Sequence, residues 1–125
     1  ISTLLTVLTF FNFNCTTAQE YKNLASAEFE KNLAKAPTAQ LIDVRTPEEY
    51  KDGYIKGAKN IDFYKPDFAA KMDSLDKKKP VYVYCAAGGR SSKAAKILTG
   101  KGFKEVYNLT GGFDDWKNQK KAIVK

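Results

Sequence analysis

The sequence contains no histidine among its 125 residues, and this absence removes several kinds of catalytic site. Ser-His-Asp and Cys-His catalysis both use an imidazole as the general base, and many zinc sites use one as a ligand. Cysteine is also scarce, because Cys15 and Cys85 are the only two and stand far apart in the chain. We therefore expect no metal site and no bound cofactor.

Charge is missing from residues 1–19, which contain no Asp, Glu, Lys or Arg. Their apolar residues are Leu4, Leu5, Val7, Leu8, Phe10, Phe11 and Phe13. This run has about the length of a signal-peptide core, and it is too short and too rich in Thr and Asn to predict a membrane span. We expect an export segment with processing near Gln19, and hence a periplasmic or secreted protein. Lipidation of Cys15 is the less favoured alternative, because such processing prefers small residues before the cysteine and here Phe13 and Asn14 precede it.

Residues 20–125 have the mixed composition of one globular domain. An apolar content of 43% in a chain of this length supports one hydrophobic core and not two. The formal net charge of +7 raises the possibility of a polyanionic partner. Lys and Arg are, however, interspersed with Asp and Glu and form no basic and aromatic face, so we expect no nucleic-acid partner.

One stretch places a cysteine between a strand and a helix. Val81–Tyr84 is a β-branched and aromatic run that predicts a buried strand, and Ser91–Leu98 has the apolar spacing of a helix, with Ser91 expected as its cap. The small residues between them allow backbone N–H groups to turn inward and form an anion-binding nest beside Cys85. Such surroundings, with Arg90 nearby, lower a thiol pKa and favour the nucleophilic thiolate. The simpler interpretation is that Cys85 is a small buried hydrophobe.

The rest of the chain alternates helices and strands. We expect helices after a Ser26 cap, after a Thr46 capping box, within 63–75 and after Gly112, and strands at 40–44, 58–61 and 105–109. This order predicts a three-layer α/β sandwich, with a mainly parallel central sheet and helices on both faces. Ligands of such sheets bind beyond the carboxyl ends of the strands, which is where Cys85 falls.

Several other residues have a structural interpretation. We expect Arg45 to form an ion pair with a nearby carboxylate such as Glu49, and Asp43 to anchor a loop at a strand end. Phe113 and Trp116 are expected in the core, because aromatic residues at helical spacing are typical of packing positions.

Four segments resemble the rhodanese-like domain family of sulfurtransferases. Residues 41–50 (LIDVRTPEEY) are similar to its amino-terminal signature, and residues 53–61 (GYIKGAKNI) to a second family segment. Residues 82–91 resemble the active-site loop, and residues 109–116 (LTGGFDDW) the closing motif. The four occur in the family's order and spacing, and the resemblance as a whole extends over residues 21–118, which is most of the chain.

The resemblance implies double-displacement catalysis by Cys85. Cys85 would attack the outer sulfur of a small anionic donor such as thiosulfate, and a thiol or cyanide acceptor, including a thioredoxin-like protein, would take the sulfur from the resulting persulfide. The residues implied to bind the substrate are Ala86, Ala87, Gly88, Gly89, Arg90 and Ser91. A module of the same fold that carries sulfur or binds a partner without turnover is the alternative.

The loop departs from two related patterns. Cysteine-dependent phosphatases need C-x5-R, whereas Arg90 follows Cys85 in a C-x4-R spacing, so we do not expect phosphatase activity. Ala86 and Ala87 stand where many thiosulfate-using loops carry a charged and a hydroxyl residue. We therefore expect weak thiosulfate affinity or a different donor. Tyr54 replaces the usual histidine of its motif and is expected to be structural.

Overall fold

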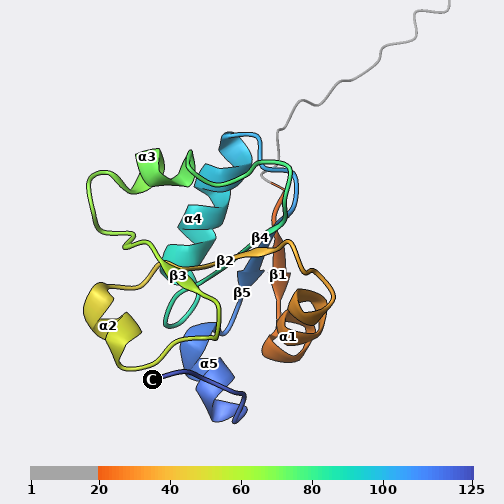
Figure 1. Ribbon diagram of the computed structural model, residues 1–125, viewed down its shortest axis with the longest axis vertical. Helices are drawn as coiled ribbons and strands as arrows, with labels where there is room; N and C mark the ends of the chain where they lie inside the picture. The colour runs from red at the N-terminus through yellow and green to blue at the C-terminus, as the bar shows by residue number, and fades with distance from the viewer. Residues whose placement is uncertain (1–19) are drawn as a thin grey trace, which may run out of the picture.

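The computed structural model describes residues 20–125, and it contains one parallel sheet with helices on both faces (Figure 1). The strands are hydrogen-bonded in the order β1-β5-β4-β2-β3, and every pair runs parallel. The elements are β1 Lys22–Leu24, α1 Ser26–Ala34, β2 Gln40–Asp43, α2 Pro47–Lys51, β3 Lys59–Asn60, α3 Phe68–Met72, β4 Val81–Tyr84, α4 Gly89–Gly100, β5 Val106–Leu109 and α5 Gly112–Asn118. The predicted three-layer α/β sandwich is confirmed, whereas the predicted export segment and Cys15 lie outside the described residues.

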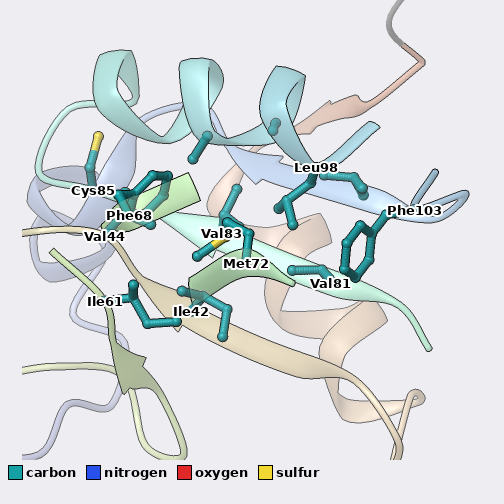
Figure 2. Packing of buried hydrophobic residues seen from close by; sticks show 13 residues of the cluster. Ile42, Val44, Ile61, Phe68, Met72, Val81, Val83, Cys85, Leu98 and Phe103 are labelled. Atoms are coloured by element: carbon teal, nitrogen blue, oxygen red, sulfur yellow. The ribbon is translucent and has the colours of Figure 1, made fainter. Parts of the chain in front are cut away.

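Strand β4 is the centre of the sheet, and all four of its side chains are buried. Because successive side chains of a strand point to opposite faces, its Val-Tyr-Val-Tyr sequence supplies both layers of the core. Val81 and Val83 pack in the cluster under α3 and α4 (Figure 2), and Tyr82 and Tyr84 pack in the cluster that includes Phe113 and Trp116. Phe113 and Trp116 are therefore core residues, as predicted.

Three helices begin at the same edge of the sheet, the edge where the carboxyl ends of the strands lie. Helices α2, α4 and α5 follow the carboxyl ends of β2, β4 and β5, and these ends are adjacent because the three strands are neighbours in register. In Figure 1, α2, α5 and the loop before α4 lie at the same end of the molecule. The fold thus brings three helix N-termini together around the residue that follows β4.

The predicted capping box of α2 is confirmed. The Thr46 side chain accepts from the backbone N–H of Glu49, and the Glu49 carboxylate accepts from the backbone N–H of Thr46. Pro47 occupies the first turn, where a backbone N–H would have no partner within the helix, so its missing N–H costs no hydrogen bond. This local arrangement fixes the Glu49 side chain at the start of α2.

Several predicted boundaries are wrong. Helix α1 is capped at Ala25 and not Ser26, whose hydroxyl instead donates to Asp115 of α5 at 2.6 Å. Helix α3 is limited to Phe68–Met72, and the strand predicted at 58–61 contains only Lys59–Asn60. Strand β1, which pairs with β5, was not predicted.

Tyr54, expected to be structural, stacks on Tyr50 with ring centroids 4.1 Å apart, and its backbone pairs with Val124. No helix among residues 20–125 is long and apolar enough to cross a bilayer.

Candidate active site

Cys85 directly follows β4 and lies at one end of the core cluster, beside the loop that leads into α4 (Figure 2). The loop turns at Gly88, whose φ of 98° is in the left-handed region that glycine adopts most readily. Helix α4 therefore begins at Gly89, and Ser91 lies in its first turn. The predicted Ser91 cap is wrong, because the left-handed turn at Gly88 starts the helix two residues earlier.

Three hydrogen-bond donors converge on the Cys85 sulfur. The backbone N–H groups of Gly88 and Ser91 lie 3.1 and 3.4 Å from Sγ, and the Ser91 hydroxyl lies 3.3 Å away. Both Cys85 and Ser91 are buried, so water competes little for these bonds. The anion-binding nest predicted from the small loop residues is present in the structure, and its centre is the sulfur itself.

This environment favours the thiolate form of Cys85. Burial alone would raise the pKa of the thiol, because it disfavours the charged form. The hydrogen bonds from the Ser91 side chain and from the backbone of Ser91, Ala87 and Gly88 outweigh burial, and the pKa of Cys85 lies below its usual value of 9.0. A thiolate in a pocket of N–H donors is a nucleophile that needs no histidine.

Helix α5 orients the Cys85 loop through two backbone hydrogen bonds. The backbone N–H of Phe113 donates to the Cys85 carbonyl at 2.8 Å, and that of Asp114 donates to the Ala86 carbonyl at 3.0 Å. These bonds hold the two carbonyl oxygens toward α5 and leave the following N–H groups free to face the sulfur. Gly112, with a φ of 64°, permits the contact, because a Cβ there would lie 2.7 Å from the Ala87 nitrogen. From the sequence, Gly111 and Gly112 were expected only to precede a helix within the closing motif, and their contact with the Cys85 loop was not predicted.

Arg90 is held by Glu49. Its two terminal nitrogens donate to the two Glu49 carboxylate oxygens at 2.8 and 3.0 Å, and its guanidinium lies over the exposed Tyr64 ring at 5.4 Å. The hydrogen bond from Arg90 is the main reason that the pKa of Glu49 falls to about 2, and Glu49 in turn raises the pKa of Arg90. Neither Glu49 nor Tyr64 was predicted to lie at this site.

Arg45 forms the predicted ion pair with a nearby carboxylate, but the partner is Asp43 and not the suggested Glu49. Arg45 pairs with Asp43, with Nη2 2.7 Å from Oδ2, and both residues are buried. Arg45 also donates to the Gly53 carbonyl at 2.7 Å, and its guanidinium lies 4.1 Å from the centre of the Phe113 ring. Asp43 is thus a hydrogen-bonding anchor, as predicted, and with Arg45 it joins the end of β2 to the turn after α2 and to α5.

The side chains of the remaining predicted site residues do not reach the Cys85 sulfur. Ala86 is partly exposed and Ala87 and Gly89 are exposed, so the Cys85 loop is open to solvent on this side. Lys93, one turn into α4, is exposed as well. Among the described residues, no group of three or more Cys, Asp and Glu side chains is arranged to hold a metal ion. Ser91 is the one predicted binding residue whose side chain reaches the sulfur.

Comparison with known proteins connects this loop to a family. The Rhodanese-like domain family matches residues 25–119. An uncharacterized protein of Bacillus subtilis, YqhL, is 42% identical over 101 residues, which are 81% of this chain and 76% of that protein. A protein of Schizosaccharomyces pombe named putative mitochondrial thiosulfate sulfurtransferase is 37% identical, over 81% of this chain and 83% of its own.

Solved structures agree with the sequence matches. The crystal structure of a rhodanese-related protein from Thermoplasma volcanium superposes with a TM-score of 0.73 at 28% identity, and the match covers 83% of this chain and 98% of that one. The family match and the solved structure thus point to the same group of proteins. This chain belongs to the rhodanese-like domain family of sulfurtransferases.

Proposed function

We propose that this protein transfers a sulfane sulfur from a small anionic donor to a thiol or cyanide acceptor through a persulfide on Cys85. The observation that carries the proposal is the convergence of three hydrogen-bond donors on a sulfur whose pKa is lowered. The names of relatives such as the Schizosaccharomyces pombe protein support the same chemistry.

In the first half-reaction, the Cys85 thiolate attacks the outer sulfur of a donor such as thiosulfate. A bond forms between Sγ and that sulfur, the sulfur–sulfur bond of the donor breaks, and sulfite leaves with the bonding electron pair. Thiolate and thiosulfate together carry the same charge as persulfide and sulfite, so no proton has to move. The absence of histidine is therefore consistent with the reaction.

In the second half-reaction, an acceptor thiolate or cyanide attacks the terminal sulfur of the persulfide, and the Cys85 thiolate leaves with the electron pair of the broken bond. The N–H groups of Gly88 and Ser91 stabilise negative charge at Sγ, both in the free enzyme and as it reappears in this step. Ala86, Ala87 and Gly89 leave the loop open to the acceptor, which can be a protein thiol of the thioredoxin type.

Steady-state kinetics test the proposal. Donor and cyanide are varied together, and a covalent sulfur intermediate predicts parallel double-reciprocal lines with sulfite released before thiocyanate forms. Cys85→Ser is expected to abolish turnover, whereas Ser92→Ala, at a neighbour that does not contact the sulfur, is expected to retain it. Turnover that survives in Cys85→Ser would contradict the proposal. Sulfur uptake without turnover would instead support the non-catalytic carrier.

A further inference from the structure

The Cys85 loop has one positively charged side chain, Arg90, and an ion pair with Glu49 neutralises it. Arg90 is the only Lys or Arg from Cys85 to Ser92. Both of its terminal nitrogens bind Glu49, which neutralises the guanidinium within hydrogen-bonding distance. An incoming donor therefore meets a loop whose side chains carry no net positive charge.

Glu49 is not free to release Arg90. Its Oε1 atom also accepts hydrogen bonds from the Thr46 backbone N–H and hydroxyl, each at 3.1 Å, as part of the cap of α2. Tyr64 covers the guanidinium at 5.4 Å. Turning Arg90 toward a donor would break two charge-assisted hydrogen bonds and leave a carboxylate beside the incoming anion.

The other charges near the loop do not replace Arg90. Lys93 is exposed, so water and salt screen it. Glu48, also in the first turn of α2, is exposed and is screened in the same way. What remains for the donor is the inward N–H groups of the loop and the start of α4. Those partial charges suit one anionic sulfur, whereas a dianion brings a second charge that no side chain compensates.

We propose, on the basis of the sulfur-transfer function proposed above, that the Glu49–Arg90 pair makes this site selective for sulfur donors that carry a single negative charge, such as organic persulfides and thiosulfonates, over dianionic thiosulfate. Glu49 is then a specificity-determining residue that acts through Arg90. The sulfur-transfer step is unchanged, because with a thiosulfonate the sulfur–sulfur bond breaks in the same way and a sulfinate leaves with the electron pair.

The test compares two donors that differ by one charge. Methanethiosulfonate is a monoanion and thiosulfate is a dianion, and both deliver a sulfur atom from a sulfonyl-type centre. The wild-type protein is expected to have the higher kcat/KM with methanethiosulfonate. Glu49→Gln keeps the size and an oxygen for the Thr46 cap but removes the charge. It is expected to shift the kcat/KM ratio about tenfold toward thiosulfate, the size expected when one unit charge near the donor is no longer balanced.

Two further variants separate this explanation from others. Glu48→Gln makes the same change of net charge one residue away and is expected to leave the donor ratio unchanged. In the double variant Glu49→Gln with Arg90→Met, both charges are absent, and the ratio is expected to return to that of the wild type. If Arg90 bound thiosulfate directly, the double variant would lose thiosulfate activity selectively, and this result would overturn the inference.

The outcomes also distinguish this inference from the function on which it rests. If Cys85 gains sulfur from both donors but Glu49→Gln leaves their ratio unchanged, the selectivity inference fails and the sulfurtransferase proposal stands. If neither donor transfers sulfur to Cys85, as measured by intact mass, both proposals fail. If Glu49→Gln does not fold, the two donors are compared on the wild-type protein, and a kcat/KM with thiosulfate equal to or above that with methanethiosulfonate would overturn the inference.

Discussion

The Ser91 hydroxyl lies 3.3 Å from the Cys85 sulfur and 3.2 Å from the Gly88 carbonyl oxygen, so its single proton has two acceptors. A hydrogen bond to a charged acceptor is roughly twice as strong as one to a neutral acceptor. The hydroxyl is therefore expected to donate to the sulfur when Cys85 is a thiolate and to Gly88 when it is a neutral thiol. Ser91 would thus stabilise the reactive form selectively.

Ser91→Ala is expected to raise the Cys85 pKa by about one unit, because losing one neutral donor to a thiolate costs about 1.5 kcal/mol. The measurement is the pH dependence of alkylation by iodoacetamide, whose midpoint should lie below 9.0 in the wild type and move upward in the variant. Ser92→Ala is the matched control. An unchanged midpoint in Ser91→Ala would show that the backbone donors alone set the pKa.

Gly112→Ala is expected to destabilise the protein by about 1–3 kcal/mol and to slow sulfur uptake, because a non-glycine residue is strained at a φ of 64° and the new Cβ would lie 2.7 Å from the Ala87 nitrogen. Urea unfolding measures the first effect. Gly100→Ala is the control, because nothing lies within 4 Å of a Cβ built there and alanine favours the helix. Equal stability of the two variants would contradict the close packing of α5 against the loop.

Asp43→Asn is expected to cost about 3–5 kcal/mol of unfolding free energy, because it leaves the buried Arg45 guanidinium without a counter-charge. Asp67→Asn removes one partner of the exposed Asp67–Lys71 pair and is expected to cost less than about 0.5 kcal/mol. Thermal or urea unfolding of both variants checks the contrast. A small effect at Asp43 would mean that water reaches Arg45.

The Glu49–Arg90 pair is expected to make stability depend on acid pH. The folded-state pKa of Glu49, about 2, lies below the ordinary value of 4.5, so its contribution is fully present above about 4.5. That contribution is lost as the pH falls toward about 2. Because the pair is partly exposed, we expect no more than about 1 kcal/mol. The stability difference between wild type and Glu49→Gln should shrink across this interval; a difference that is constant with pH would contradict the assignment.

The features that the sequence predicted well are local ones. The four apolar residues of β4, the Thr46 capping box and the cysteine between strand and helix each depend on neighbours within a few positions. Such patterns are visible without knowledge of the fold. The alternation of these elements was sufficient to predict the sandwich and to place Cys85 at the carboxyl edge.

The features that were missed depend on how side chains and segments are arranged in three dimensions, and no local pattern reveals that arrangement. Arg90 and Glu49 are 41 positions apart, and Arg45 had a nearer partner two positions away in Asp43. No spacing in the sequence distinguishes these two pairings. Strand β1 has only Leu24 buried among its three residues, so it lacks an alternating pattern, and it exists because it pairs with β5. The role of α5 in orienting the loop is likewise a contact between distant segments.

The most direct test of the central claim is the intact mass of the protein after incubation with thiosulfate or methanethiosulfonate. We expect a gain of one sulfur atom that is lost when cyanide is added. The adduct should persist in Cys15→Ser, which removes the other thiol, and be absent in Cys85→Ser. No adduct from either donor, or an adduct that remains in Cys85→Ser, would contradict the account of Cys85 as the residue that accepts and transfers sulfur.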